Sequence, residues 1–572
     1  MKAVIVAVNS QYVHSSLAPW CLAAGVKKYC RSAVETVVIE STVNESPDSL
    51  TNKIAEQCPS LVGFSCYIWN IEYVRSVLHE VRERTGAVIV LGGPEAGYNA
   101  RELLENEQDI DYVLAGEGEL PFAMLCDCAA LGESPEDIPG LCRRNDSGEI
   151  SLSPPHCPSD QPPSPYTEEY FQSLRGRMAY LETGRGCPYR CAFCLSSVCG
   201  SWRNFDIERA KKELLMLARS GAQTVKLVDR TFNADRARAR ELFSFIAERY
   251  GADIPAGVCF HFELAGDLLD GQTLAVLENM PAGAVQVEIG IQSFNPDTLA
   301  AVDRVTDVEK VCRAVRRLIA CGRVHTHIDL IAGLPLEDMP SFRRSFEQAM
   351  KLRPHMLQMG FLKLLHGAPM CEQPERFRCE HSTEPPYEVT STPWMTVHEL
   401  RHLHKIEKAL DRVYNSGRFR RTAEYAAHAG GISMFDLYEH IASIFEESSM
   451  SRASLDAFTA ALQEKLLEIN GVDPDLLRDA MVCDRLSSSP SAPLPDCLRV
   501  NDRRTRAVRF ELERDPATRR GFGVKRAVAM LYGEGCGVWC DAVNRDPVTG
   551  QYPLHRFDID FLENKDNGKT HD

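Results

Sequence analysis

Strand and helix patterns alternate along most of this sequence, and no other feature constrains its fold as strongly. In residues 1–150, helical stretches separate short apolar runs rich in strand-forming residues, at 3–8, 36–39, 61–66, 87–91 and 111–115. Such alternation is typical of a mostly parallel sheet with helices on both faces. The sequence therefore predicts an α/β protein whose first domain, residues 1–150, is doubly wound and Rossmann-like.

The carboxyl ends of these predicted strands carry polar or glycine-containing segments. They are Val8-Asn9-Ser10, Ser65-Cys66-Tyr67, Gly92-Gly93-Pro94 and 116–119. Ligands of a doubly wound sheet bind at this edge, and glycine lets the backbone approach a ligand closely. The same segments also fit ordinary turns between a strand and a helix, so their spacing alone leaves both interpretations open.

A Pro/Ser-rich tract separates this domain from a second set of alternating elements. Residues 151–175 predict an extended linker, because prolines exclude regular structure there. Six strands are predicted within residues 176–370, at 180–182, 224–228, 257–262, 284–289, 325–330 and 356–361. They predict a partial (β/α)6 barrel with its active site at the carboxyl ends of the strands. After a second linker at 371–395, residues 396–572 predict a mainly helical domain with strand-like runs at 508–513 and 524–532.

Three closely spaced cysteines follow the first predicted barrel strand. Cys187, Cys191 and Cys194 have the spacing C-x3-C-x2-C. Three thiolates on one loop reach three corners of a cuboidal [4Fe–4S] cluster, whereas most such clusters use four cysteines. The loop therefore predicts a cluster with one open iron for a small bidentate ligand. Cys199 lies beyond the compact loop, and we interpret it as an unligated thiol.

Other interpretations of the cysteines compete with this one. The loop either holds three buried thiols without a metal or contributes to a zinc site. Zinc prefers four tetrahedral ligands, and neither a second C-x2-C pair nor a histidine lies nearby. Near the end of the chain, Cys536 and Cys540 would hold a second cluster only with ligands from elsewhere.

The cysteine loop and the order of the domains resemble a known family. An aromatic residue, Phe193, precedes the last cysteine, and the whole loop is similar to that of the radical S-adenosylmethionine (SAM) superfamily. The doubly wound domain before the barrel resembles the cobalamin-binding branch of that superfamily. The resemblance covers residues 1–370, and the remaining third resembles the family-specific C-terminal domain of one subgroup. It implies a [4Fe–4S] cluster, SAM and cobalamin as cofactors.

The resemblance also implies which barrel residues bind SAM. Phe193 would lie near the adenine, while Glu288 and Gln292 would point toward the cofactor pocket from the fourth strand. Arg304 would pair with the methionine carboxylate, a role that suits its planar guanidinium. Gly333 belongs to the fifth-strand segment, whose backbone would contact adenine.

Two points in the barrel stay open. The glycine-rich motif that usually binds the methionine amine is replaced by Asp229-Arg230-Thr231-Phe232-Asn233. Without the resemblance, Glu263, Glu288 and Asp329 are only carboxylates at a barrel mouth, where such groups are often solvated or salt-bridged. Arg304 likewise has the alternative of a solvated surface arginine after the fourth strand.

No histidine of this sequence is expected to bind cobalt. The motif Asp-x-His-x-x-Gly is absent, because none of the 16 histidines follows an aspartate by two positions. The resemblance implies that cobalamin binds without such a ligand. The residues expected to contact the corrin are Ser65, Tyr67 and Trp69. Those expected to line its nucleotide tail are Gly92, Gly93 and Glu117. The alternative is a Rossmann-like domain that only packs or recruits substrate.

The resemblance implies an enzyme that methylates an unactivated carbon of an unknown small-molecule or peptide substrate. It would need an external electron donor such as flavodoxin or ferredoxin. A radical rearrangement, cyclisation or oxidation without methyl transfer is one alternative, and a non-catalytic cobalamin or redox sensor is another. Methylthio transfer to RNA fits poorly, because the cysteines of the first domain form no compact cluster-binding set.

Charge and hydropathy limit the expected partners and location. The formal net charge of −16 argues against a broad phosphate-binding surface, so nucleic acid is not an expected partner. No apolar stretch of about 18 residues is present, and the first residues lack the features of a signal peptide. The 21 cysteines are too scattered for a disulfide scaffold. We therefore expect a cytoplasmic protein that does not enter a membrane.

Overall fold

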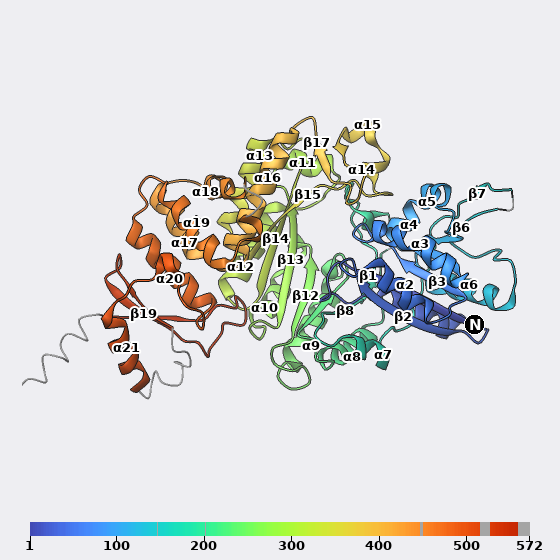
Figure 1. The fold of residues 1–572 in the computed structure, drawn as a ribbon, viewed down its shortest axis with the longest axis horizontal. Coiled ribbons are helices and arrows are strands. Elements are labelled where there is room, and N and C mark those ends of the chain that lie inside the picture. The colour runs from blue at the N-terminus through green and yellow to red at the C-terminus, as the bar shows by residue number, and fades with distance from the viewer. Residues whose placement is uncertain (146, 199, 201, 447–449, 515–526, 559–572) are drawn as a thin grey trace, which may run out of the picture.

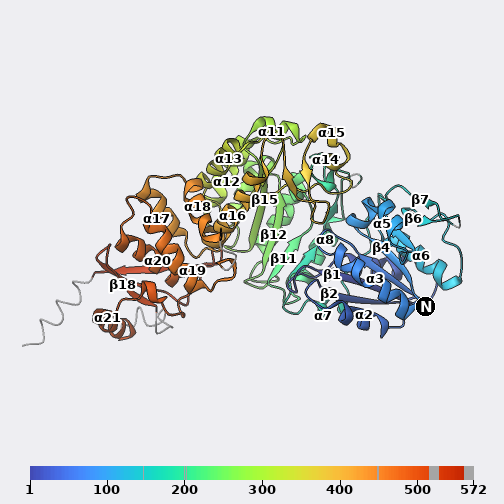
Figure 2. The ribbon, with the colours of Figure 1, turned by 45° about the horizontal axis from the view of Figure 1, so that its top comes forward.

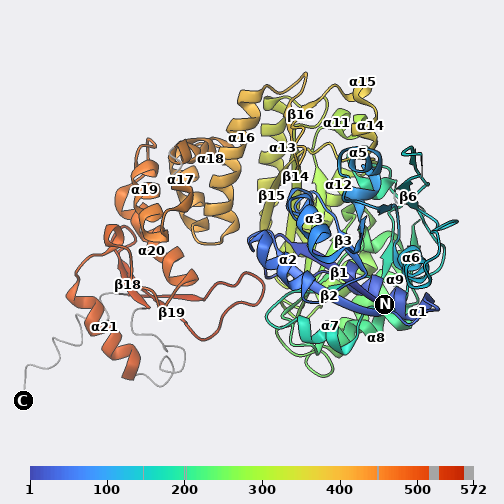
Figure 3. The same ribbon diagram turned by 45° about the vertical axis from the view of Figure 1, so that its right-hand side comes forward.

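Three parts of the chain lie in a row in Figure 1: an N-terminal sheet, a central barrel and a C-terminal helical part. Figure 3 shows the N-terminal sheet in front of the barrel and the C-terminal helical part beside them. The computed structural model describes residues 1–145, 147–198, 200, 202–446, 450–514 and 527–558. Among the helices so described, none is both long and apolar enough to cross a bilayer. The predicted fold class, α/β with a partial barrel and a mainly helical C-terminal part, is confirmed.

The N-terminal part contains seven strands: β1 (Lys2–Asn9), β2 (Glu35–Thr42), β3 (Leu61–Ser65), β4 (Val88–Gly92), β5 (Tyr112–Leu114), β6 (Leu141–Arg144) and β7 (Ile150–Ser151). They form one sheet in the order β2-β1-β3-β4-β5-β6-β7. The first five run parallel, as predicted, and the sequence pattern does not anticipate the antiparallel edge of β6 and β7. The parallel order brings the carboxyl ends of β1, β3, β4 and β5 to one edge.

Six helices accompany this sheet: α1 (Ala18–Tyr29), α2 (Pro47–Ala55), α3 (Ile71–Thr85), α4 (Pro94–Tyr98), α5 (Ala100–Asn106) and α6 (Glu119–Leu131). Val4 and Val6 of β1 join one core with α2, α3 and α5, whereas Ile5 joins another with α1 and α6. Successive side chains of a strand point to opposite faces, so an apolar strand such as β1 needs helices on both sides.

The central part is an open barrel of six strands: β8 (Ala179–Leu181), β11 (Thr224–Leu227), β12 (Cys259–Leu264), β13 (Val285–Gln292), β14 (His325–Ala332) and β15 (Met356–Phe361). All neighbours pair in parallel in the order β15-β14-β13-β12-β11-β8. The six predicted strands are thus present. The accompanying helices are α8 (Ile207–Ala218), α9 (Arg236–Arg249), α10 (Gly271–Glu278), α11 (Pro296–Ala301), α12 (Val308–Cys321) and α13 (Met339–Lys351).

The inner face of the barrel is polar. In β13, Val285 is buried in the apolar core, while the next residue, Gln286, contacts His327 of β14 across the inner face. Glu288 contacts His261 of β12 on the same face. Because side chains alternate along a strand, one strand serves both the apolar outer core and a polar interior. The interior therefore offers hydrogen-bonding groups to a ligand at the strand ends.

The C-terminal part combines helices with a small antiparallel sheet. Its elements are α16 (Val397–Leu410), α17 (Arg420–Gly430), α18 (Met434–Ala442), α19 (Leu455–Leu467), α20 (Pro474–Ser488), α21 (Arg503–Arg514), β18 (Val528–Leu531), β19 (Cys536–Cys540) and β20 (Leu554–Phe557). Figure 2 shows α16 and α18 beside the barrel and α21 farther away from it. The prediction of a strand-like run at 508–513 is wrong, because it lies inside α21; a short apolar run fits either period. The run at 524–532 falls partly outside the described residues, and its end forms β18.

Asn415 fastens the C-terminal part to the edge strand β15. Its Nδ2 donates to the Leu357 carbonyl at 2.9 Å, and its Oδ1 accepts from Leu357 N at 3.0 Å. An edge strand exposes unpaired backbone groups, and this amide satisfies one such pair. The remaining short elements are α7 (Glu168–Ser173), β9 (Gly184–Arg185), β10 (Arg203–Asn204), α14 (Pro369–Glu372), α15 (Pro374–Phe377), β16 (Glu380–His381) and β17 (Val389–Ser391).

Candidate active site

The cysteine loop follows β8 and lies between the two short strands β9 and β10, which pair antiparallel. Its backbone is held from two sides: Ala192 N donates to Val302 O at 2.9 Å, and Met370 N donates to Ala192 O at 3.0 Å. Cys191 is buried, and Cys187 and Cys194 are partly exposed. The loop thus presents three thiols at the carboxyl end of the barrel, where parallel barrels place their chemistry.

Two side chains contact these thiols. Thr231 Oγ1 lies 3.3 Å from Cys187 Sγ, and Arg304 Nη1 donates to Cys191 Sγ at 3.5 Å. Burial raises the pKa of the Cys191 thiol, and the Arg304 guanidinium acts against this by lowering it. A donor or a positive charge beside a sulfur favours the thiolate, which is the form that ligates iron.

Within the described part of the chain, no group of three His, Cys, Asp or Glu side chains is placed to hold one metal ion. The thiols of Cys187, Cys191 and Cys194 lie on one loop of eight residues. Such an arrangement suits three corners of a [4Fe–4S] cluster. Cys199 lies outside the described residues.

Arg304 points into the barrel mouth, where its Nη2 donates to the Gly290 carbonyl near the end of β13. Three buried atoms here have no hydrogen-bond partner among the described residues: Arg304 Nε, Gln292 Oε1 and Asp329 Oδ1. Buried polar atoms are nearly always paired in folded proteins. This set therefore fits a polar ligand such as SAM, and Arg304 is not a solvated surface arginine.

Gln292 ends β13 in an unusual backbone conformation. Its φ is 73°, and the pairing of β13 with β14 is irregular between Gly290 and Gln292. A non-glycine residue in the left-handed region is uncommon, and such strain is concentrated at functional sites. A Cβ at Gly290 would meet the Gln292 amide, so the Gln292 side chain lies directly against the backbone at position 290.

Neighbouring carboxyl groups of the barrel interior differ in how easily they ionise. Burial alone would raise the pKa of Glu288, but His261 at 2.8 Å and Lys226 at 3.5 Å lower it to about 2. Burial, reinforced by Glu288 and Glu263, raises the pKa of Asp329 well above its ordinary value. A carboxyl whose raised pKa favours its protonated form, beside the ionised Glu288, can offer both a donor and an acceptor to one ligand.

Phe193 and Gly333, the two predicted adenine contacts, lie in apolar surroundings. Phe193 is partly buried and packs against the barrel core. Gly333 follows β14 with a φ of 88°, and a Cβ there would meet the side chains of Leu400, Leu362 and Val389. An apolar wall suits a planar base, and the adenine contacts stay predictions.

The segment that replaces the glycine-rich motif supports the cysteine loop. Asp229 accepts hydrogen bonds from Thr183 N at 2.9 Å and Thr183 Oγ1 at 2.7 Å, just before the loop begins. Burial raises the pKa of Asp229 to about 7. The sequence pattern does not predict these roles of Asp229 and Thr231, because both residues contact partners about 45 positions away in the chain.

An aromatic edge forms at the carboxyl end of the N-terminal sheet. The Tyr67 and Trp69 rings stack with centroids 4.3 Å apart and planes 5° apart. Trp69 is 49% exposed, although its Nε1 donates to Val8 O at 3.3 Å. Tyr12 and Val13, on the loop after β1, are also exposed, and the sequence analysis does not single them out. Exposed apolar side chains gathered at one edge indicate a binding surface, and a corrin ring fits its character.

The turn after β4 brings backbone close to this edge. Gly93 has a φ of 98°, and a Cβ there would lie 2.6 Å from the Cys66 carbonyl oxygen, so only glycine fits. Gly92 ends β4, and Ser65 is buried at the end of β3, where its carbonyl accepts from Asn70 Nδ2 at 2.9 Å. The predicted cobalamin contacts thus share one edge of the sheet, and contact with the cofactor stays a prediction.

The aromatic edge and the cysteine loop lie on facing surfaces. Glu117, just after β5, pairs with Arg185 and Arg203 of the strands that flank the loop. On the loop after β1, His14 Nδ1 lies 2.8 Å from Tyr180 Oη of β8. Glu117, predicted to line the nucleotide tail, therefore already has two guanidinium partners.

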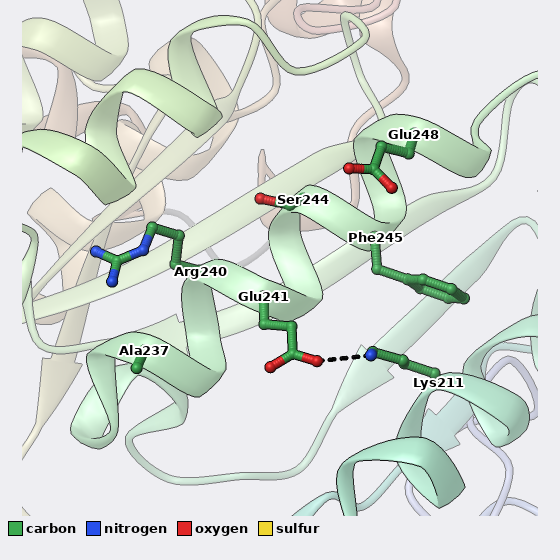
Figure 4. Close-up of a pocket in the computed structure, with 7 residues that line it drawn as sticks. All are labelled: Lys211, Ala237, Arg240, Glu241, Ser244, Phe245 and Glu248. Carbon is green, nitrogen blue, oxygen red and sulfur yellow. Dashed lines mark hydrogen bonds and ion pairs between the residues drawn. The ribbon is translucent and has the colours of Figure 1, made fainter.

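A separate hollow on the outside of the barrel carries no such features. Figure 4 shows it between α8 and α9, where Lys211 Nζ pairs with Glu241 Oε1 at 2.6 Å. Its lining residues belong to these two outer helices and not to the strand ends. We therefore place the candidate site at the cysteine loop and the aromatic edge.

Comparison with known families assigns each part of the chain. Residues 181–349 match the family described as "Radical SAM superfamily", and residues 3–125 match "B12 binding domain". The barrel is thus the part of the chain that matches the radical SAM superfamily. Residues 375–518 match the family described as "Protein of unknown function (DUF4080)". The resemblance predicted from the cysteine loop and from the order of the domains is confirmed.

The curated relatives of this chain include a cobalamin-dependent enzyme. The "Cobalamin-dependent radical SAM methyltransferase TokK" of Streptomyces tokunonensis is 28% identical over 367 residues, which are 59% of this chain and 50% of TokK. The chain spans about half the length of the first curated relatives that it matches.

Two solved structures share the fold. TsrM from Kitasatospora setae, with cobalamin and a [4Fe–4S] cluster bound, superposes with a TM-score of 0.55 at 21% identity, covering 67% of this chain and 76% of TsrM. OxsB, with aqua-cobalamin and SAM bound, superposes with a TM-score of 0.56 at 14% identity, covering 85% of this chain and 79% of OxsB.

Proposed function

We propose that this protein is a cobalamin-dependent radical SAM enzyme that methylates an unactivated carbon of a small-molecule or peptide substrate. One observation carries the proposal: the three-cysteine loop, with the unpaired polar atoms of Arg304, Gln292 and Asp329 near it, lies on a surface that faces an exposed aromatic edge. The methyltransferase relative and the B12-binding family match support the same reading.

The residues of this chain would bind and orient, while the cofactors would supply the difficult chemistry. When bound, the reduced cluster cleaves SAM reductively and cobalamin carries the methyl group. Arg304 would pair with the methionine carboxylate through its planar guanidinium. The Asp329 carboxyl, whose raised pKa favours its protonated form, would donate a hydrogen bond, and the Glu288 carboxylate would accept one. An external donor such as flavodoxin or ferredoxin would supply the electrons.

Product analysis tests this function. The full-length protein is reconstituted anaerobically with iron, sulfide and hydroxocobalamin, then reduced in the presence of SAM and candidate extracts. Formation of both 5′-deoxyadenosine and S-adenosylhomocysteine is expected, because methyl transfer consumes a second SAM. 5′-Deoxyadenosine without S-adenosylhomocysteine would favour rearrangement, cyclisation or oxidation. Neither product from fully loaded protein would favour a sensor.

The cysteines provide the matched controls for that experiment. Cys187→Ala, Cys191→Ala and Cys194→Ala should each abolish SAM cleavage, because each removes one of three cluster ligands. Cys199→Ala and Cys312→Ala should cleave SAM like the parent; Cys312 lies on α12, outside the loop. Full iron loading and turnover in Cys191→Ala would contradict the cluster assignment.

A further inference from the structure

Two arginines face each other where the cysteine loop begins and ends. Arg185 of β9 and Arg203 of β10 are directly opposite in the antiparallel pairing, and all three loop cysteines lie between them in the sequence. We call this strand pair the neck of the loop. Like charges directly opposite across a strand pair repel each other and destabilise the pairing. The neck therefore needs a negative charge between the two guanidinium groups.

That charge comes from the B12-binding domain. Glu117 Oε1 and Oε2 accept from Arg203 Nη2 at 2.7 Å and 2.6 Å, and Oε2 also accepts from Arg185 Nη1. The side chains of Arg185, Arg203 and Glu117 are 16%, 12% and 15% exposed. One carboxylate of one domain thus bridges two facing arginines of the other, largely shielded from solvent.

The two arginines depend on Glu117 to different degrees. Arg185 has two further carboxylate partners, Glu119 at 2.6 Å and Glu182 at 2.8 Å. Among the described residues, Arg203 has Glu117 as its one carboxylate partner, and its Nε is buried without a hydrogen bond. Loss of the Glu117 charge would therefore leave Arg203 uncompensated opposite Arg185. A buried charge that loses its partner is strongly destabilising.

A rigid turn holds Glu117 in place. Its backbone N donates to His156 O at 2.8 Å, and His156 N donates to Ala115 O at 2.9 Å, on either side of Gly116. Gly116 has a φ of 88° and touches the His156 backbone so closely that a Cβ would not fit. The Glu117 side chain therefore extends from a fixed backbone position at the carboxyl end of β5, on the edge proposed to bind cobalamin.

We propose that Glu117 is a positioning residue that holds the neck of the cysteine loop closed from the B12-binding domain. The placement of the three cysteines then depends on the docking of the two domains. This inference rests on the proposed function, because it assumes that the loop carries a cluster. It adds a dependence of cluster retention on a residue that lies outside the barrel.

Cluster retention tests the neck. Full-length protein is reconstituted anaerobically, and the release of iron to a ferrous chelator is followed by absorbance. Glu117→Gln should release iron about tenfold faster than the parent, as expected when a buried charge loses its partner. Glu107→Gln is the matched control: it breaks a pair with Arg75 in the same domain, away from the neck, and should match the parent.

A double variant separates the neck from a general loss of stability. In Glu117→Gln/Arg203→Gln the repulsion across the neck is gone, because Arg185 keeps Glu119 and Glu182 as partners. Iron release should return to within about threefold of the parent, since the unpaired buried charge is absent.

A parental rate in Glu117→Gln, or no recovery in the double variant, would overturn the inference. If Glu117→Gln alone is insoluble, a double variant that is soluble and loaded with the cluster supports the inference about the neck. A double variant that is also insoluble overturns it. A parent that takes up no cluster would instead contradict the proposed function.

Discussion

Arg304 connects the cysteine loop with the strand ends through one side chain. Its Nη1 reaches Cys191 Sγ at 3.5 Å, its Nη2 reaches the Gly290 carbonyl, and its Nε is buried without a partner in the described residues. A planar guanidinium presents donors in several fixed directions, whereas an ammonium is a single point charge. Arg304 is therefore suited to hold a carboxylate beside the loop.

Arg304→Ala should weaken SAM binding at least about tenfold, because removing one partner of a buried charge pair typically costs about 2–5 kcal/mol. Arg304→Lys should recover only part of the loss, because it cannot reproduce the guanidinium geometry. The measurement is equilibrium binding of SAM to the anaerobic, cluster-loaded protein, with iron content checked for each variant. Arg317→Ala removes an exposed arginine that pairs with Glu278 on the outer helices, and it should bind SAM like the parent. An unchanged affinity in Arg304→Ala would remove Arg304 from the site.

The turns after the parallel strands fix the aromatic edge at the scale of secondary-structure elements. In the turn from β4 to α4, Gly93 allows the backbone to pass close to Cys66. Two residues on, Glu95 is 3% exposed and accepts from Tyr387 Oη of the segment after the barrel. The same turn therefore shapes the edge of the sheet and docks it against the rest of the molecule.

Gly93→Ala should destabilise the N-terminal domain and weaken cobalamin binding. It combines a left-handed φ with a Cβ 2.6 Å from a backbone oxygen, so the turn must shift as well as bear strain. Gly132→Ala separates these effects, because Gly132 also has a positive φ of 70° but nothing within 4 Å. The readouts are the thermal midpoint and cobalamin uptake by absorbance. Equal losses in the two variants would show that close approach at Gly93 is unimportant.

Among the described residues, the buried ion pairs that join the sheet to the barrel include two at separate places in the molecule. One is the neck, and the other is Arg177 with Glu40 at 2.6 Å, where the side chains are 7% and 10% exposed. Each pair bridges the two domains, so separating the domains would leave charged side chains without their partners. The barrel also encloses neutral histidines: burial, with His261 as a further cause, lowers the pKa of His327 to about 4.

His327 should make stability depend on pH in a defined direction. An unfolded histidine titrates near 6.5, so below this pH the unfolded chain takes up a proton that the folded chain refuses until about pH 4. The stability that the neutral His327 contributes above pH 6.5 is therefore lost as the pH falls to about 4. The free energy of unfolding decreases by about 1.4 kcal/mol per pH unit over this range. Buried carboxyls such as Glu337, whose pKa burial raises to about 7, act in the opposite sense.

A comparison of variants isolates the histidine from these carboxyls. His327→Gln keeps an acceptor for Gln286 but cannot titrate. As the pH falls from 6.5 to 4, its free energy of unfolding should therefore rise by about 3 kcal/mol relative to that of the parent. Urea midpoints at several pH values measure this. His79→Gln is the control, because the His79 side chain is 79% exposed. Parallel pH curves for parent and His327→Gln would contradict the prediction.

The fold was predictable because its signals are local. Alternating strand and helix patterns specify the parallel sheet and the barrel, since side-chain periodicity is set by neighbours in the sequence. The failures are also local: the run at 508–513 is too short to distinguish strand from helix. β6 and β7 lack a helix between them, so the alternation pattern contains nothing that marks them.

The sequence by itself determined the cysteine loop, because C-x3-C-x2-C places three thiols within eight residues of one another. Only the tertiary structure decided what surrounds it. Arg304 meets Cys191 across 113 positions, Thr231 meets Cys187 across 44, and Glu117 meets Arg203 across 86. No periodic pattern encodes such pairs, because they form where separate strand ends and two packed domains converge. Charge compensation at the neck is therefore a property of the docked domains, although each charge is visible in the sequence.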